Sequence, residues 1–273
     1  MKIGKALKEE RTRLGLTQDE MIQGIVHKSH YSKIEHGIKG ISADSLFRIL
    51  FAHHIDVDGF LEMIKDEYIS KDEKEAEELE NKIMTAFNNH NKDEIEKYIQ
   101  EVLKLSGNKI FKYRVIVAIA TFRRKLNELS NDLKKNIINE FTKHDTWLED
   151  IDSLKLFGNC MQVFSEEQLD DCMKQILKRY LNNENSEKIA ERIAIICNNY
   201  LYYCYYFKHL NNSNIVDCLN YLKKLDTRSH YMFYRIAGFF FEYMFKGDKT
   251  KAKEIKDQLV MWGYGGRVAS WKI

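Results

Sequence analysis

The chain has 273 residues, with 43 Lys and Arg against 41 Asp and Glu, and it contains no proline. This length leaves room for two domains. The net charge of only +2 excludes a basic field over the whole surface, so any affinity for nucleic acid must come from a local patch. A chain without proline and rich in Leu, Ile, Lys and Glu favours long helices, and we expect an all-α fold.

Cysteine and histidine usage gives no sign of a disulfide framework or a metal site. The five cysteines are odd in number and form no CxxC pair, which is typical of reduced thiols in a cytosolic protein. The nine histidines lack ligand spacing, so we expect neither a metal nor a cofactor. The longest apolar run, residues 115–122, is too short to cross a membrane.

Residues 1–65 predict a domain of five short helices with apolar spacings of three and four. The first ends at Gly15. Thr17 and Glu20 form a capping box that starts the second, and Gly37 stops the third. Ser42 and Asp56 start the last two. Between Thr17 and Gly37 there is room for two helices and a tight turn, which is the geometry of a helix-turn-helix whose second helix enters the DNA major groove.

The polar side chains of this motif are the expected DNA contacts. Gln18 begins the second helix, where it would bond a phosphate. Lys28 and Ser29 lie at the end of the third helix that faces base edges, and Lys28 would bind guanine. Tyr31 and Ile34 form the buried side of that helix. The full predicted set is Arg11, Arg13, Gln18, Lys28, Ser29, His30, Ser32 and Lys33. The alternative is a small helical module with ordinary surface polar groups.

An acidic run separates this domain from the rest of the chain. Residues 66–80 hold eight acids against two lysines, and residues 1–80 contain no asparagine although the later part is rich in it. We interpret residues 66–80 as an exposed helical connector that becomes amphipathic around Leu79 and Ile83. Residues 81–273 then form a second domain.

The second domain predicts consecutive helices separated by Asn- and Gly-containing breaks. The expected spans are 73–88, 93–106, 111–127, 131–142, 147–159, 165–181, 186–208, 213–225, 229–245 and 248–262. Pairs of helices recur at roughly 35–45 residues, which suits helical-hairpin repeats of the tetratricopeptide or HEAT type. Residues 115–122 could form a buried strand, but without a partner strand we favour a buried helix.

Two of these helices, 186–208 and 229–245, are apolar around most of their circumference. Such helices are buried between layers or face a cavity or a partner. The glycines at 263, 265 and 266 could cradle an anion, but we expect them to end the preceding helix and let Trp271 pack back. With no Gly-rich phosphate loop and with carboxylates spread over charged helix faces, the sequence does not favour an enzyme.

At four places the sequence resembles a known family. Residues 16–18 and 32–37 (LTQ and SKIEHG) resemble the XRE or lambda-repressor type of helix-turn-helix. Residues 41–46 and 55–61 (ISADSL and IDVDGFL) are similar, more narrowly, to the Rgg/GadR/MutR regulators of Gram-positive bacteria. The resemblance is close over residues 1–65 and general beyond them. Ile22 departs from the XRE pattern, which has a small residue there.

The resemblance implies a cytoplasmic, homodimeric transcription factor with a tetratricopeptide-like C-terminal domain. Many such regulators take part in quorum sensing by binding short hydrophobic peptide pheromones. A dimer would bind an inverted-repeat operator with half-sites about 34 Å apart.

A concave helical surface can hold an extended peptide through amide and aromatic side chains. The candidates are Arg123, Asn159, Asn198, Asn199, Tyr202 and Tyr203. The alternative is a turn or surface role for the asparagines and core packing for the tyrosines. A ligand-independent repressor and an interaction protein controlled by a protein partner also stay open.

Overall fold

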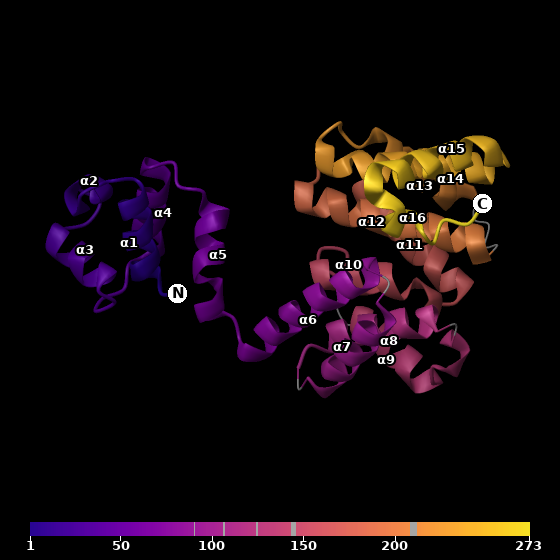
Figure 1. Ribbon diagram of the computed structural model, residues 1–273, viewed down its shortest axis with the longest axis horizontal. Helices are drawn as coiled ribbons and strands as arrows, with labels where there is room; N and C mark the ends of the chain where they lie inside the picture. Colours follow the sequence, from indigo (N-terminus) through magenta and orange to yellow (C-terminus); the bar gives the residue numbers. More distant parts are fainter. Residues whose placement is uncertain (90, 106, 124, 143–145, 208–211) are drawn as a thin grey trace. The chain divides into compact units, whose positions relative to one another are not determined.

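A computed structural model describes residues 1–89, 91–105, 107–123, 125–142, 146–207 and 212–273, and every regular element in these ranges is helical (Figure 1). The all-α prediction is therefore confirmed. The chain divides into two compact units, Met1–Glu77 and Glu78–Ile273. The boundary falls inside the acidic 66–80 segment.

The N-terminal unit contains five short helices around one core. They are α1 (Ile3–Arg13), α2 (Gln18–Ile22), α3 (Lys28–Glu35), α4 (Ala43–Ala52) and α5 (Val57–Tyr68). Gly15 and Gly37 each adopt a φ of +70°, which a glycine accepts without strain, and they follow α1 and α3 as predicted. The largest buried side chains are Leu7, Met21, Tyr31, Ile34, Ile49 and Phe60.

α6 (Lys71–Asn88) contains the larger part of the acidic run, residues 71–80, and extends into the C-terminal unit. The prediction of an exposed connector over residues 66–80 is wrong for one face of this helix, because Ala76 and Leu79 are each only 3% exposed. They begin a buried stripe that continues at Ile83 and Ala86. Small and apolar residues at spacings of three and four bury this side while the carboxylates stay in water.

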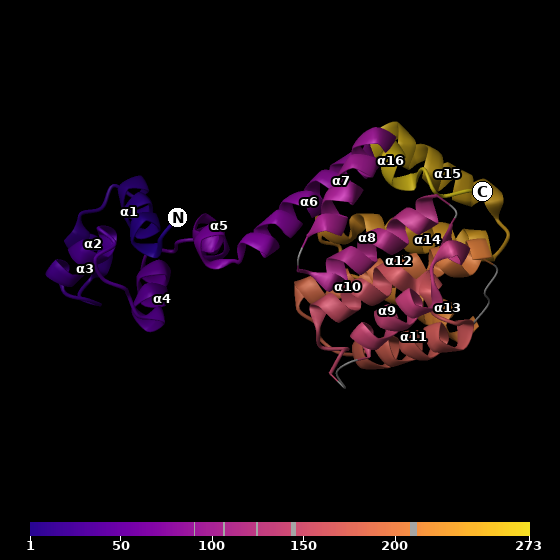
Figure 2. The same ribbon diagram turned by 90° about the horizontal axis from the view of Figure 1, so that it is seen from below.

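The C-terminal unit is a set of helices in which most contacts join a helix to the next or to the next but one in the chain (Figures 1 and 2). α8, α10, α12 and α14 form a series in which each helix contacts the next, and α13 packs against both α12 and α14. Beyond α6 the helices are α7 (Lys92–Lys104), α8 (Lys109–Phe122), α9 (Asn131–Phe141), α10 (Ile151–Cys160), α11 (Glu166–Tyr180), α12 (Glu187–Phe207), α13 (Asn212–Lys224), α14 (Met232–Phe245), α15 (Lys249–Leu259) and α16 (Gly265–Val268). Short 3₁₀ turns lie at 126–128, 161–163 and 229–231.

The helix spans follow the prediction except at four ends, and the ends expected at residues 106 and 208 lie outside the described residues. The helix expected over 248–262 stops at Leu259, where a π-type turn begins. The helix expected over 111–127 stops at Phe122, and residues 126–128 form a separate turn. The helix expected from residue 147 begins at Ile151, because Asp150 caps it by accepting the backbone N–H of Ser153 at 2.9 Å. The helix expected from 229 opens with a 3₁₀ turn. Residues 115–122 are helical, so the strand alternative is wrong.

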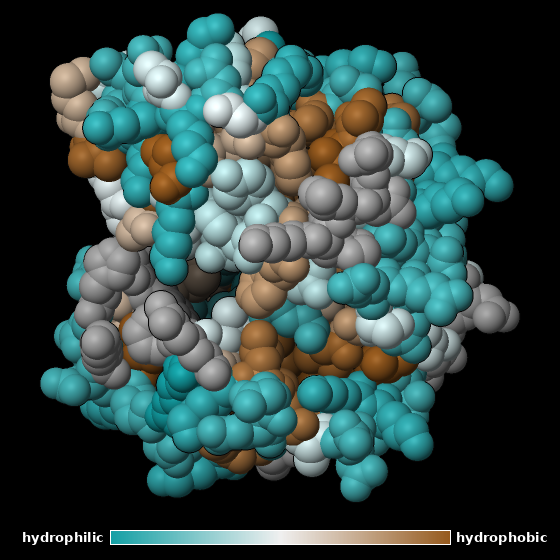
Figure 3. Space-filling model, turned by 90° about the vertical axis from the view of Figure 1, so that its right-hand side faces the viewer, coloured by the Kyte–Doolittle hydropathy of each residue, from teal (hydrophilic) through white to brown (hydrophobic). Residues whose placement is uncertain are grey.

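The end of the chain packs back onto α14 as expected. Gly263 has a φ of +88° inside a π-type turn, Val260–Tyr264, that separates α15 from α16. Beyond α16, Trp271 is 3% exposed and stacks on Phe240 with 4.2 Å between ring centroids. Figure 3 shows one face of the molecule, which is hollowed and carries apolar patches between hydrophilic side chains.

Candidate functional site

The turn between α2 and α3 is built from local signals. Thr17 Oγ1 accepts the backbone N–H of Glu20, and Glu20 Oε2 accepts the backbone N–H of Thr17 at 2.7 Å, so the predicted capping box is present. The hydrogen bonds from the Thr17 backbone and hydroxyl lower the pKa of Glu20. Gln23 and Gly24 then adopt left-handed backbone angles that end α2 and turn the chain into α3.

A buried carboxylate, Glu35, joins the first three helices. Its side chain is 1% exposed and accepts Arg11 Nε at 2.6 Å and Gln18 Nε2 at 2.8 Å. Burial alone would raise the pKa of Glu35, but the hydrogen bonds from Arg11 and Gln18 outweigh it and hold the pKa below its ordinary value. We name Glu35, Arg11 and Gln18 the Glu35 cluster. Arg11 also donates to the Leu16 carbonyl oxygen at 2.8 Å, so this guanidinium is held by contacts inside the unit.

The opposite side of α3 is polar and open to solvent. Lys28, Ser29, His30 and Lys33 are exposed, and Ser32 is half-buried. Tyr31 and Ile34 are buried, as the sequence indicated. The structure thus brings the predicted base-contacting residues together on one helix face, which we name the α3 face.

Two predicted DNA contacts are paired with acids of the same unit. Lys28 forms an exposed ion pair with Asp19, whereas Arg13, itself exposed, pairs with the buried carboxylate of Glu10 one turn earlier in α1. Exposed pairs contribute little free energy, so Lys28 can exchange Asp19 for a phosphate or base oxygen at small cost.

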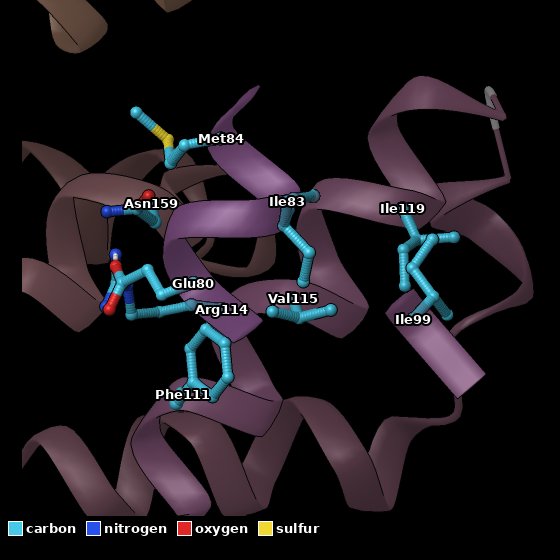
Figure 4. A pocket seen from close by; sticks show the side chains of 10 residues that line it. Glu80, Ile83, Met84, Ile99, Phe111, Arg114, Val115, Ile119 and Asn159 are labelled. Carbon is cyan, nitrogen blue, oxygen red and sulfur yellow. Dashed lines mark hydrogen bonds and ion pairs between the residues drawn. The ribbon is translucent and has the colours of Figure 1, made fainter. Parts of the chain in front are cut away.

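The C-terminal unit contains a cavity of about 280 Å³ between α6, α7, α8 and α10, which we name the α6–α8 pocket (Figure 4). Its wall is mainly apolar, with three polar side chains, Glu80, Arg114 and Asn159, gathered on one side (Figure 4). The apolar lining residues are Ile83, Met84, Ile99, Phe111, Val115, Ala118 and Ile119. An apolar cavity with a few convergent polar groups is the usual form of a ligand site.

Only one of the predicted peptide contacts lines this pocket. Asn159 is on its wall and donates to the Lys155 carbonyl oxygen at 2.7 Å. Asn199 lies next to it in space, since it donates to the Gly158 carbonyl oxygen at 3.0 Å. Asn198 Oδ1 is buried and has no hydrogen-bond donor among the residues that the structure describes.

The other three predicted contacts lie elsewhere in the unit. Arg123 pairs with Glu96 and lines a second cavity, of about 290 Å³, between α7 and α8. Tyr202 and Tyr203 are half-buried in an aromatic cluster at the end of α12, where Tyr203 stacks on Phe207 with 5.0 Å between centroids. Their half-buried state is compatible with both the packing and the binding interpretation.

Sequence analysis missed Arg114 and Glu80, which carry the charge of the pocket. Arg114 is the one arginine within the α8 sequence, where apolar residues dominate, and such an isolated charge is a signal for a buried polar site. Glu80 gave no signal because it belongs to the acidic run.

Comparisons with known proteins match this architecture. The helix-turn-helix family model matches residues 7–58. Residues 7–58 are a helix-turn-helix domain. A search of curated proteins finds no significant match.

Solved structures match the whole chain. A protein of Listeria monocytogenes EGD-e described as a transcriptional regulator shares 18% identity at a TM-score of 0.75, covering 98% of this chain and 94% of that one. The pheromone receptor Rgg2 of Streptococcus dysgalactiae shares 14% identity at a TM-score of 0.67, with 98% of each chain covered. PrgX in complex with cCF10 shares 18% identity at a TM-score of 0.71, covering 96% of this chain and 87% of that one. The predicted Rgg-type architecture, a helix-turn-helix domain followed by a helical C-terminal domain, is confirmed as the fold.

Among the described residues there is no helix long and apolar enough to span a membrane, and no group of three or more His, Cys, Asp or Glu side chains that could hold a metal ion. Of the five cysteines, all free, Cys172 is half-buried and the others are buried. Burial raises the pKa of Cys160 to about 12, which keeps this thiol protonated and unreactive.

Proposed function

We propose that the protein is a sequence-specific DNA-binding transcriptional regulator controlled by a short hydrophobic peptide that binds its C-terminal unit. Two observations together support this proposal. An exposed polar α3 face lies in a helix-turn-helix domain, and the whole chain has the fold of receptors solved with peptide pheromones.

On DNA, the α3 face would enter the major groove, with Lys28, Ser29 and Lys33 nearest to base edges. Arg13 would contact the phosphate backbone. The Glu35 cluster supports a different role for Arg11 and Gln18, because their side chains orient α1 and α2 against α3. Gln18 has a second amide hydrogen with which it would still donate to a phosphate.

In the C-terminal unit, the peptide would lie along α8, α10 and α12. Asn159, Asn198 and Asn199 would bond its backbone, while Arg123, Tyr202 and Tyr203 would contact its more distant parts. The support is the polar side of the α6–α8 pocket and the buried acceptor at Asn198, which a peptide N–H would satisfy. We further propose a homodimer that acts in the cytoplasm without a cofactor and without catalytic activity.

Selection from a random DNA library with the full-length protein tests the first half of the proposal. The expected product is an inverted repeat with half-sites about 34 Å apart, or a multiple of that spacing. An enriched site without two-fold symmetry would contradict the homodimer, and no enrichment over bulk DNA would contradict sequence-specific binding.

A thermal-shift screen with a library of short apolar peptides tests the second half. A ligand at about 100 times its Kd stabilises the native state by about 2.7 kcal/mol, which is well within detection. A peptide that raises Tm and changes operator affinity is the expected result. Operator binding that no peptide alters would instead support the ligand-independent repressor or the partner-controlled protein.

A further inference from the structure

Arg114 joins α6 to α8. Its Nη2 donates to Glu80 Oε1 at 2.7 Å, and the side chains are 16% and 38% exposed, respectively. Arg114 Nε is buried and has no hydrogen-bond acceptor among the described residues. Because a carboxylate can take Nε and Nη2 together, Glu80 fills only half of this fork. A buried N–H without an acceptor costs free energy that a better-placed anion would recover.

A second arginine, Arg192, interacts with the charge of Arg114. Arg192 Nε is also buried without an acceptor among the described residues. Burial lowers the pKa of Arg192, and the charge of Arg114 lowers it further, against the opposing effects of Tyr234, Glu191 and Glu80. Arg114 and Arg192 face Glu80 and Glu191, so the formal charges balance here, but the buried Nε–H groups of both arginines lack an acceptor, and an additional carboxylate would satisfy one of them.

The size of the α6–α8 pocket limits what the anion can carry. With about 280 Å³ and a mainly apolar wall, this cavity lies at the small end of ligand sites, which are about 300–1,000 Å³. It therefore suits one large apolar side chain next to a carboxylate. Asn159 uses its NH₂ group on the Lys155 carbonyl oxygen, so its Oδ1 is available on the same wall to accept an N–H.

We propose that the α6–α8 pocket binds the C-terminal residue of a short apolar peptide and that the peptide carboxylate replaces Glu80 on Arg114. The side chain fills the apolar part, and the N–H of the same residue donates to Asn159. Since Arg114 Nε is enclosed, the carboxylate reaches it only after Glu80, the more exposed partner, moves out. α6 thereby loses its ion pair to α8. This inference rests on the peptide-controlled function proposed above.

Fragment binding to the full-length protein with ¹³C-methyl-labelled methionine tests this site. Met84 lines the pocket and is 56% exposed, and its signal is assigned with Met84→Leu. Three probes distinguish the contribution of the carboxylate from that of the N–H group: N-acetyl-phenylalanine, its C-terminal amide, and 3-phenylpropanoate, which lacks the N–H. A ligand this small is expected to bind with a Kd of about 1 mM, so titration to about 20 mM saturates the site.

The acid should bind about tenfold more tightly than the amide, because it alone makes charge-assisted hydrogen bonds, and more tightly than 3-phenylpropanoate. Arg114→Gln should abolish the preference for the acid, whereas Glu80→Gln should strengthen acid binding by removing the competing carboxylate. Lys109→Gln, an exposed charge removed from the same helix, is the matched control and should change nothing. In hydrogen exchange, the acid should speed the exchange of residues 80–86 and the amide should not.

Equal binding of acid and amide, a preference that survives Arg114→Gln, or weaker acid binding in Glu80→Gln would overturn the proposal. So would slower exchange in α6 with the acid, or an unshifted Met84 signal with all three probes. Equal binding of 3-phenylpropanoate and N-acetyl-phenylalanine would replace the peptide with a simple carboxylic acid as the ligand. If this site fails while the peptide screen still yields a ligand that alters operator binding, the proposed function stands and only the location is wrong.

Discussion

Gly4 lies where α1 crosses the end of α3, and replacing it tests how closely the two backbones must approach. A Cβ atom at Gly4 would be 1.8 Å from the Ile34 carbonyl oxygen and 2.8 Å from its carbonyl carbon. Real Cβ atoms essentially never come nearer than 3.0 Å to such atoms. Gly4→Ala therefore forces the two helices apart by more than about 1 Å, because the obstacle is backbone and cannot rotate away.

Two opposing effects determine how much the unfolding free energy changes in Gly4→Ala. Overpacking of a closed contact costs about 1–3 kcal/mol, and replacing glycine by alanine inside a helix returns up to about 1 kcal/mol. We expect a net loss of about 1–2 kcal/mol in the unfolding free energy of the N-terminal unit. A loss of this size speeds hydrogen exchange through global opening of that unit about tenfold.

Hydrogen exchange of the full-length protein measures this change directly. Amides of α1 and α3 should exchange about tenfold faster in Gly4→Ala, and those of α12 in the other unit should keep their rate. Gly40→Ala is the matched control, since nothing lies within 4 Å of a Cβ there and φ is not positive. Equal protection in the Gly4→Ala and Gly40→Ala variants would refute the argument from close backbone approach.

Three further predictions concern the same unit. Because the folded pKa of Glu35 is below the ordinary 4.5, the stabilising contribution of this carboxylate is complete above pH 4.5 and is lost as pH falls through the folded pKa. In Glu35→Gln, hydrogen exchange should show that the unfolding free energy falls by about 3 kcal/mol at neutral pH and depends less on acid. An unchanged acid profile would contradict this. Thr17→Ala should cost about 1 kcal/mol through loss of the cap. Thr12→Ala, the same chemical change at an exposed position in the last turn of α1, is the control. Equal losses in the two variants would argue against the capping box. Lys33→Ala should weaken operator binding, measured by fluorescence anisotropy, and should reduce the slope of log affinity against log salt by about 1. Lys249→Ala in the other unit is the control and should change neither the affinity nor the slope. An unaltered slope in Lys33→Ala would show that Lys33 does not contact DNA.

Helix positions were accessible from the sequence because their causes are local. The capping boxes at Thr17 and Ser165 lie within four residues of the backbone they bond, and the glycines after α1 and α3 act on the adjacent turn. The errors fall at helix ends such as Phe122 and Ile151, where one cap or one 3₁₀ turn shifts the boundary by a few residues.

The contacts that define the candidate sites are not local. Glu35 bonds Arg11 and Gln18 across 24 and 17 residues, and Arg114 bonds Glu80 across 34. Arg11 and Gln18 were predicted to contact DNA because exposed Arg and Gln side chains at a helix-turn-helix usually contact phosphate. Helical periodicity places position 35 beside Tyr31 and Ile34 on the buried side of α3, but a glutamate there is ordinarily read as exposed because a buried carboxylate needs partners from other helices. Such pairings depend on how two helices cross, and the sequence pattern of one helix does not predict that geometry.

The two sides of α3, one buried and one exposed, have separate roles, and this bears on how a regulator of the proposed kind can diversify. The fold of the N-terminal unit rests on the Glu35 cluster and on the contact at Gly4, while Lys28, Ser29 and Lys33 face solvent. In the DNA-binding role proposed above, substitutions on the α3 face would alter the preferred operator without a loss of stability, since surface changes away from such contacts usually stay within about 0.5 kcal/mol. After a gene duplication, two copies could drift to separate operators by point changes on one helix face, each remaining folded at every intermediate step.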